Sequence, residues 1–213
     1  SRFAPSPTGD LHLGSALALL AAWASVRSRG GTFVWRVEDL DGPRAVPGSA
    51  ERQMEDARWL GFDWDHGPDT GGPDAPYRQS ERFPLYDDAL RRLAEAGHLF
   101  PCRRSRKDLR ALATAPHGAS GLPPYPPEWR PEPLAPGWLD ALGSRPDCAL
   151  RFRVDEGPVT FEDRVVGTVT EDVRETTGDV VLKRRDGVFA YQLAVVVDDL
   201  AMDVSEVVRG MDL

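Results

Sequence analysis

Residues 2–39, RFAPSPTGDLHLGSALALLAAWASVRSRGGTFVWRVED, predict the fold of this chain because they contain a strand, a helix and a second strand. The short first strand, residues 2–4, leads into a turn with two prolines and a glycine. A helix is expected over residues 13–29, and residues 32–39, rich in β-branched and aromatic side chains, predict the second strand. Two strands joined by a crossover helix run parallel in one sheet. We therefore predict an α/β fold.

The predicted helix and its preceding turn carry two further signals. Four apolar residues recur at helical spacing on one face, namely Leu13, Leu17, Leu20 and Ala24. The turn is expected at the carboxyl edge of the parallel strands, where ligands bind. There the helix N-terminus attracts phosphate or carboxylate and favours a neutral form of His12. A phosphate site and a simply capped helix start remain alternatives, because the turn has neither a P-loop nor a GxGxxG pattern.

The composition limits the class of protein. The chain has 213 residues, of which 41% are apolar, enough for one large domain or one domain with an insert. Its formal net charge of −8 argues against nonspecific coating of nucleic acid, although a local basic patch could hold RNA. Two cysteines favour a reduced, cytoplasmic protein. No stretch is long and apolar enough to span a membrane, so we expect no membrane partner.

The remainder of the chain predicts more helices and strands around a proline-dense segment. Residues 98–150 combine a short strand, a basic helix and the stretch GLPPYPPEWRPEPLAPGW. We interpret these residues as an insert, with a disordered linker as the alternative. The other expected elements are helices over 49–60, 81–97 and around 191–199, and strands within 149–154, 159–163, 166–171, 179–185 and 206–209.

Several stretches, in order along the chain, resemble one family. PSPTGDLHLGS, residues 5–15, resembles the HIGH region of class I aminoacyl-tRNA synthetases, with His12 as the first residue of that motif. RFAPSPTG together with RVEDLD is similar to the glutamate branch. The stretches EDLDGPRAVPGSAE, DGVFAYQLAVVVDDL and VVRGMDL resemble the glutamyl-queuosine tRNA(Asp) synthetases, short paralogues of glutamyl-tRNA synthetase. Val195 fits these paralogues better than glutamyl-tRNA synthetases, which tend to have Asn there.

The resemblance implies a class I Rossmann-like parallel sheet with a small inserted subdomain. Residues 1–97 and 151–213 would form two halves of the catalytic domain, and 98–150 the insert. The family forms glutamyl-adenylate from L-glutamate, ATP and Mg²⁺ without tRNA, and then transfers glutamate to queuosine at the wobble position of tRNA(Asp). Its KMSKS-like lysine signature lies downstream of VVRGMDL, so we expect the given sequence to be truncated before it. We also expect a monomer.

Glutamate carries two carboxylates and one ammonium, so its site requires fixed cations and at least one anion. Arginines can bind a carboxylate through two hydrogen bonds, and they favour glutamate over glutamine because an amide N–H would face a donor-only partner. Glu38 is the expected partner of the ammonium, and a surface salt bridge with Arg36 or Arg44 is the alternative. The resemblance assigns the glutamate contacts to Arg2, Phe3, Ala4, Pro5, Ser6, Glu38, Tyr191 and Arg209.

The resemblance places ATP at the other half of the turn. His12 and Gly14 are the expected catalytic residues, because they would hold the phosphates and stabilise charge as pyrophosphate leaves. Adenylation needs no general base or covalent nucleophile. Asp198 and Asp199 are interpreted as groups that cap or brace the site. The expected ATP contacts are Gly9, His12, Gly14 and Ser15.

In the predicted insert, the sequence departs from the family's pattern. The family often binds zinc there through C-x-C and a later Y-x₃-C. Cys102 and Tyr125 match this pattern, but Arg104 and Trp129 stand at two cysteine positions, and arginine cannot ligate zinc. We therefore predict no zinc and an apolar cluster of Tyr125, Trp129 and Trp138. The alternative is a rebuilt metal site from Cys102, His117 and Cys148.

A run of basic residues in the insert is the candidate contact with tRNA phosphates, and an ordinary solvated helix face is the alternative. The run comprises Arg103, Arg104, Arg106, Lys107 and Arg110. Two other functions compete with the one implied above: the catalytic fragment of a glutamyl-tRNA synthetase, and a synthetase-like domain that binds its ligands without catalysis.

Overall fold

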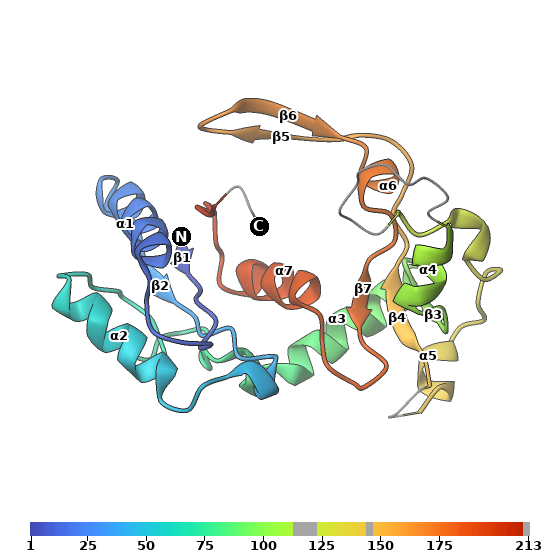
Figure 1. Cartoon of the computed structure of the whole chain (residues 1–213), viewed down its shortest axis with the longest axis horizontal. Coiled ribbons are helices and arrows are strands. Elements are labelled where there is room, and N and C mark those ends of the chain that lie inside the picture. Colours follow the sequence, from blue (N-terminus) through green and yellow to red (C-terminus); the bar gives the residue numbers. More distant parts are fainter. Residues whose placement is uncertain (113–122, 144–146, 211–213) are drawn as a thin grey trace. The chain divides into compact units, whose positions relative to one another are not determined.

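The chain forms two compact units (Figure 1). The computed structural model describes residues 1–112, 123–143 and 147–210. The first unit comprises Ser1–Tyr86 with Ala194–Leu213, and the second comprises Asp87–Leu193. His117, which belongs to the alternative metal site, lies outside the described residues.

The first unit contains the predicted βαβ arrangement. Strand β1 (Arg2–Phe3), helix α1 (Leu13–Arg27) and strand β2 (Val34–Trp35) follow one another, and the two strands are parallel. Further parallel bridges join Val34 to His66 and Val37 to Arg78. The prediction of an α/β fold with a parallel sheet is therefore confirmed. The unit also contains α2 (Ser49–Trp59), the 3₁₀ turns Gly42–Arg44 and Gln79–Glu81, the start of α3 (Phe83–Glu95) and most of α7 (Tyr191–Ala201).

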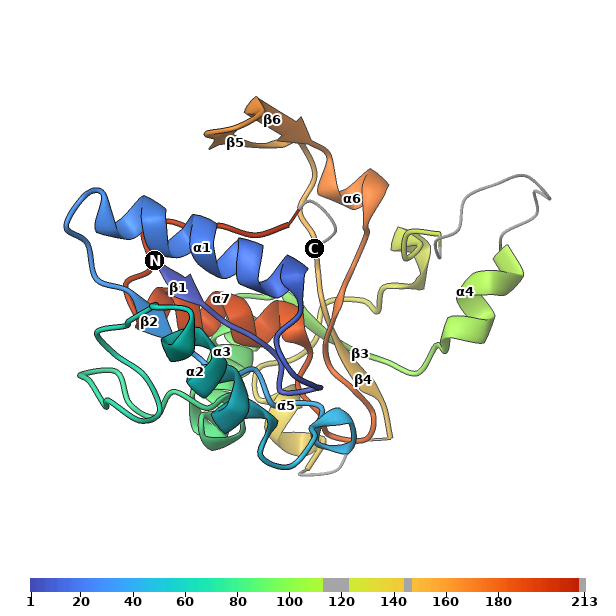
Figure 2. The same ribbon diagram turned by 60° about the vertical axis from the view of Figure 1, so that its left-hand side comes forward.

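Side chains at and beside β2 alternate between the two faces of the strand, so they pack into two separate clusters of the first unit's core. Phe33, Trp35 and Val37 point to one face of the strands and pack in one cluster with buried residues of α1 and α2. Val34 packs on the opposite side with Tyr77 and Met202. Figure 2 shows α1 and α2 on one side of β1 and β2, with α7 on the other. Arg36 thus points to the α7 side, together with Val34.

Two details of the sequence prediction are corrected. The stripe that includes Leu13 and Leu17 does not face the core, since these side chains are 86% and 64% exposed. Helix α1 instead buries Leu19, Ala22 and Val26, because it is apolar on more than one face and tertiary packing selects which face is buried. The strand expected over 206–209 is irregular chain.

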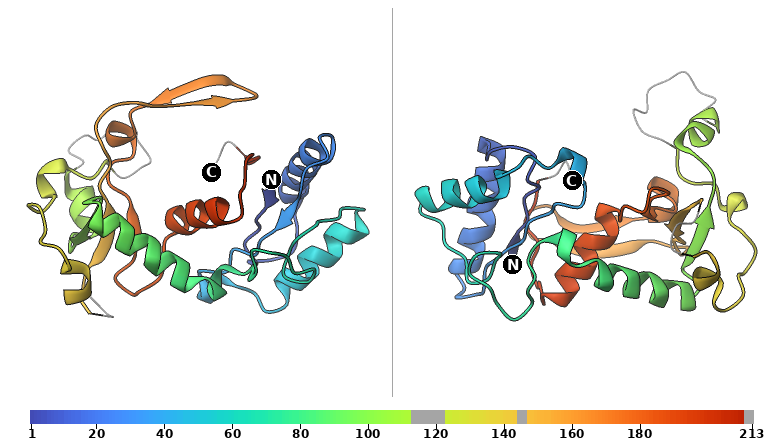
Figure 3. Two further views of the ribbon diagram at one scale, coloured as in Figure 1. Left: turned by 180° about the vertical axis from the view of Figure 1, so that it is seen from behind. Right: turned by 90° about the horizontal axis from the view of Figure 1, so that it is seen from below.

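The second unit is built around a three-stranded antiparallel sheet (Figure 3). Strand β4 (Ala149–Phe152) lies between β3 (Leu99–Cys102) and β7 (Val181–Lys183), and β5 (Val159–Asp163) forms a separate hairpin with β6 (Gly167–Glu171). The unit also contains α4 (Arg106–Leu112), α5 (Trp138–Ala141), α6 (Val173–Thr176) and the 3₁₀ turn Pro127–Trp129. Among the described residues, no helix has the length and apolar character needed to cross a bilayer.

The buried carboxylate of Asp198 anchors α7 within the first unit. It accepts hydrogen bonds from Gln79 Nε2 at 2.8 Å, Arg82 Nε at 2.7 Å and the Tyr86 hydroxyl at 2.9 Å. Burial, followed by the negative charge of Asp198, raises the pKa of Tyr86 far above its usual range, so the phenol remains a donor. Asp198 therefore ties α7 to the start of α3 and the turn before it.

Replacing Asp198 with Ala should destabilise the protein strongly. The change leaves the Arg82 guanidinium buried without its carboxylate, and breaking such a pair costs about 3–5 kcal/mol of unfolding free energy. Urea denaturation followed by tryptophan fluorescence measures this loss. The control is Asp56→Ala at an exposed position of α2, which should change stability by less than about 0.5 kcal/mol. Similar effects of the two changes would contradict the anchoring role.

Candidate active site

The turn between β1 and α1 is held in place by backbone and side-chain contacts. The Pro5 carbonyl accepts from the Glu38 amide at 3.0 Å. From α2, Gln53 Nε2 donates to the carbonyls of Ser6 at 3.2 Å and Gly9 at 2.7 Å, and Ser49 Oγ donates to the Gly9 carbonyl at 2.5 Å. Sequence reasoning missed Gln53 and Ser49. The available signal was a glutamine on the otherwise apolar, buried face of an amphipathic helix.

His12 caps the N-terminus of α1. Its Nδ1 accepts a hydrogen bond from the Ser15 amide at 3.2 Å, and its Nε2 lies 3.1 Å from Ser15 Oγ. A ring nitrogen that accepts this bond carries no proton, whereas the direction of the Nε2–Oγ contact depends on the tautomer. A Cβ atom at Gly14 would lie 3.1 Å from His12 Cε1, a tight contact that would require the ring to shift by a few tenths of an ångström. His12 and Gly14 are both exposed.

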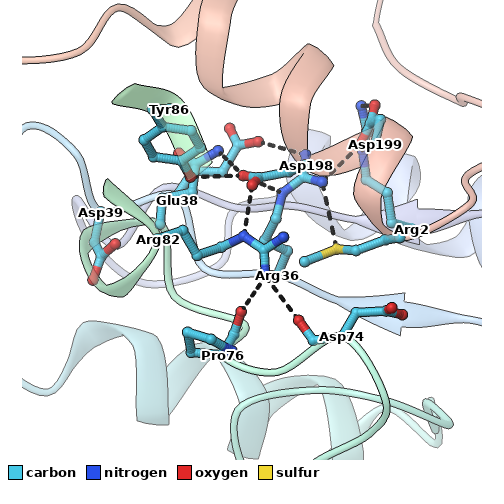
Figure 4. Close-up of polar contacts among 12 residues, drawn as sticks. Arg2, Arg36, Glu38, Asp39, Asp74, Pro76, Arg82, Tyr86, Asp198 and Asp199 are labelled. Atoms are coloured by element: carbon cyan, nitrogen blue, oxygen red, sulfur yellow. Dashed lines mark hydrogen bonds and ion pairs between the residues drawn. The ribbon is translucent and has the colours of Figure 1, made fainter. Parts of the chain in front are cut away.

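A cluster of charged side chains lies on the α7 side of β1 and β2 (Figure 4). Arg2 donates through Nε and Nη2 to the two carboxylate oxygens of Asp199, at 3.2 and 3.3 Å. Arg36, whose side chain is 0% exposed, donates from Nη1 to Asp199 at 2.6 Å and from Nη2 to Glu38 at 3.1 Å. Its Nε lies 3.7 Å from Asp198. Glu38 therefore pairs with Arg36, within a buried cluster and not on the surface.

Beside this cluster, a small cavity of about 90 Å³ opens to solvent. It brings Ser6 and Glu38, two of the expected glutamate contacts, to a single space. Asp39, also in its wall, accepts hydrogen bonds from the amide and hydroxyl of Ser80, each at 2.8 Å. The lining residues are Ser6, Pro7, Thr8, Glu38, Asp39, Asp41, Arg44 and Ala45.

The buried position of Glu38 changes its proton affinity. Burial raises the pKa of Glu38 above its ordinary value, and this effect outweighs the opposing attraction of Arg36 and Arg2. The ionised carboxylate is therefore less stable in the folded protein than in water. A cationic group bound in the cavity would stabilise the ionised carboxylate of Glu38.

The other expected glutamate contacts are distributed over the chain. Phe3 is buried in β1, Ala4 and Pro5 are half-buried after it, and Arg209 is exposed in the irregular segment that follows α7. Tyr191 is the first residue of α7 and belongs to the second unit. Within the first unit, the structure thus brings Arg2 and Glu38 into one charged cluster. Sequence reasoning did not assign Arg36 to this cluster.

In the second unit, the two residues that depart from the family's zinc-binding pattern, Arg104 and Trp129, lie next to each other. The Arg104 guanidinium lies 4.7 Å from the centre of the Trp129 ring, a cation–π contact. Cys102 Sγ and the Tyr125 hydroxyl are 3.4 Å apart, and Tyr125 donates to the Trp129 carbonyl. Among the described residues, no three His, Cys, Asp or Glu side chains are grouped so that they could hold a metal ion.

The basic residues of the insert lie at or just before α4. Arg103, Arg104, Arg106, Lys107 and Arg110 are all exposed. Arg185, which follows β7, donates from Nη2 to the Arg103 carbonyl at 2.9 Å and extends this positive surface.

Comparisons with known proteins agree with the fold. The family model described as tRNA synthetases class I (E and Q), catalytic domain, matches residues 1–213. A curated protein named Glutamyl-Q tRNA(Asp) synthetase from Nitratidesulfovibrio vulgaris is 48% identical over 100% of this chain and 65% of its own length. One of the same name from Symbiobacterium thermophilum is 49% identical, with the same coverage.

A solved structure extends the comparison. The glutamate tRNA ligase from Elizabethkingia meningosepticum, in complex with its amino acid, is 31% identical with a TM-score of 0.80, over 95% of this chain and 42% of that one. The chain belongs to the family of class I tRNA synthetase catalytic domains of the glutamate and glutamine type. It spans 65% of the length of the two curated relatives named above.

The raised pKa of Glu38 predicts how Glu38→Gln affects stability. A carboxyl whose pKa is higher in the folded than in the unfolded state favours folding when protonated, and this contribution is lost as the pH rises through the folded-state pKa. Glu38→Gln, which resembles the protonated form, should therefore be more stable than wild type at pH 8. Its advantage should fade towards pH 4. Urea denaturation across this range measures both values, and a pH-independent difference would contradict the prediction.

Proposed function

We propose that the protein activates L-glutamate with ATP and Mg²⁺, without tRNA, and transfers the glutamyl group to queuosine at the wobble position of tRNA(Asp). The observation that carries this proposal is the cavity at Glu38, beside a buried arginine pair and the turn that ends at His12. The two relatives named Glutamyl-Q tRNA(Asp) synthetase, similar over the whole chain, support it.

The charges of the cluster suit an amino acid with two carboxylates. Glu38 would accept hydrogen bonds from the substrate ammonium, which would compensate its buried negative charge. Arg2 would bind a substrate carboxylate with part of its guanidinium, and Arg209 a second one. Charge-assisted hydrogen bonds of this kind contribute roughly 1.5–3 kcal/mol each. The proposed glutamate contacts are Arg2, Phe3, Ala4, Pro5, Ser6, Glu38, Tyr191 and Arg209.

ATP would bind at the start of α1. His12 Nε2, which lies 3.1 Å from Ser15 Oγ, would donate to a phosphate oxygen in place of that contact, and the first N–H groups of the helix would attract the same charge. His12 and these N–H groups would both stabilise negative charge as the glutamate carboxylate attacks the α-phosphate and pyrophosphate leaves. The proposed ATP contacts are Gly9, His12, Gly14 and Ser15, of which His12 and Gly14 are the catalytic ones.

The insert, residues 98–150, would bind tRNA without a zinc ion. Arg104 and Trp129 stack on each other at two positions where the family pattern has cysteines, and Cys102 and Tyr125 contact each other. These contacts support an aromatic cluster in place of a metal. We also propose that residues 1–97 and 151–213 form the two catalytic halves, and that the protein is a cytoplasmic monomer, in which the free thiols of Cys102 and Cys148 remain reduced.

Glutamate-dependent exchange of pyrophosphate into ATP tests the proposed activation. The natural full-length protein should catalyse it without tRNA, with a preference for glutamate over glutamine of at least about 100-fold, because a glutamine amide would leave donors unpaired. Labelled glutamate should then appear in the anticodon loop of tRNA(Asp). Label on the terminal adenosine of tRNA(Glu), with exchange only when tRNA is present, would identify a glutamyl-tRNA synthetase instead. Glutamate binding without exchange would identify a non-catalytic domain.

The basic surface can be tested separately from activation. Arg106→Ala with Lys107→Ala should weaken tRNA binding by about tenfold and reduce the salt dependence of log K by about 2, one for each lost phosphate contact. Filter binding at several salt concentrations measures both. The matched control, Arg91→Ala with Arg92→Ala, removes two exposed positive charges from α3. Equal losses in the two double variants would show that only net charge matters.

A further inference from the structure

We propose that Asp199 is a positioning residue for the glutamate site: it holds one edge of the Arg2 guanidinium, so that the other edge is presented to a substrate carboxylate, and through Arg36 it fixes Arg2 relative to Glu38. This inference rests on the proposed function and assigns roles to two residues, Asp199 and Arg36, that do not themselves contact the amino acid.

Asp199 occupies one edge of the Arg2 guanidinium. Its guanidinium is planar and has five N–H groups in fixed directions. Asp199 accepts from Nε at 3.2 Å and from Nη2 at 3.3 Å, which occupies one edge of the plane. The two Nη1 protons and the second proton of Nη2 lie away from this edge. Because Arg2 is only 6% exposed, it has little room to turn, and the remaining edge matches a single carboxylate.

Asp199 and Arg36 link Arg2 to Glu38. Asp199 Oδ1 also accepts from Arg36 Nη1 at 2.6 Å, and Arg36 Nη2 donates to Glu38 Oε1 at 3.1 Å. The chain of contacts therefore runs from Arg2 to Asp199, then to Arg36 and finally to Glu38 (Figure 4). Arg36 is fully buried and its Nε faces Asp198 at 3.7 Å, so this bridge cannot swing into solvent. The proposed binders of carboxylate and ammonium are thus held at a fixed separation.

The negative charge of Asp199 also balances the charges of Arg2 and Arg36. Arg2 already attracts the Glu38 carboxylate, and Arg36 attracts it more strongly. Without the negative charge of Asp199, the two arginines would repel each other and would both be drawn to Glu38. Glu38 would then be neutralised by the protein and would be a weaker partner for a substrate ammonium. Asp199 keeps Arg2 directed towards a carboxylate and leaves Glu38 available to the ammonium.

A buried ion pair in the second unit provides a matched control. Asp179 accepts from Arg130 Nε at 2.7 Å and from Nη2 at 2.6 Å, so it has the same two-bond geometry as Asp199 with Arg2. Its side chain is 0% exposed, and it also accepts from the Val154 amide. A change at Asp179 therefore removes a comparable ion pair without touching the Arg2–Asp199–Arg36–Glu38 contacts.

The test measures glutamate-dependent exchange by the natural full-length protein with three variants. Asp199→Asn should raise the KM for glutamate by at least about tenfold and lower the preference for glutamate over glutamine by about tenfold, the loss expected for one charge-assisted hydrogen bond. The KM for ATP and kcat should stay within about threefold of wild type. Asp199→Glu, which retains the charge, should recover part of the glutamate KM. Asp179→Asn should lower the melting temperature and leave both KM values unchanged.

The outcomes separate this inference from the proposed function. An unchanged glutamate KM in Asp199→Asn, or equal increases in the KM values for glutamate and ATP, overturns the positioning role. If Asp199→Asn does not fold, Arg36→Lys replaces it, and an unchanged glutamate KM in that variant overturns the role as well. A wild-type protein that shows no glutamate-dependent exchange overturns the proposed function, and this inference with it.

Discussion

The fully buried guanidinium of Arg36 is the constraint on which the first unit depends. Arginine remains charged at every physiological pH, and removing an ion from water costs several kcal/mol even after the protein relaxes. The fold compensates this cost with three carboxylates, from Glu38, Asp198 and Asp199. Two of these carboxylates, Asp198 and Asp199, come from α7. The charge of Arg36, which directly follows β2, therefore determines where α7 lies in the first unit.

The three carboxylates around Arg36 have different roles because each of them has different partners besides Arg36. Asp198 accepts hydrogen bonds from Gln79, Arg82 and Tyr86 and has no exposed side-chain surface, which is the environment of a structural anchor. Asp199 is shared between Arg2 and Arg36. Glu38 reaches the cavity, and burial raises its pKa. A carboxylate that burial makes costly to ionise suits a ligand that brings a positive charge.

The second unit uses aromatic contacts where the sequence departs from a metal-binding pattern. Arg104 lies over Trp129, Arg151 lies 4.4 Å from the centre of the Tyr125 ring, and Tyr125 packs edge-on against Trp129. Cation–π contacts are strongest when the partners are partly removed from water, as they are for the buried Tyr125. Through Tyr125, which contacts Phe100 of β3 and Arg151 of β4, the cluster attaches the described part of the proline-dense segment to the sheet of this unit.

The sequence by itself determined the βαβ unit, the turn that ends at His12 and most helices and strands, because these depend on local periodicity and on turn-forming residues. It did not decide which apolar face of α1 is buried, since both faces have helical spacing and only packing against β2 and α2 selects one. The strand expected over 206–209 failed because strand formation requires a partner, which local sequence cannot supply. The charged cluster required tertiary structure for the same reason: Arg2 and Asp199 are 197 residues apart, and their pairing follows from the burial of Arg36 and not from any local pattern.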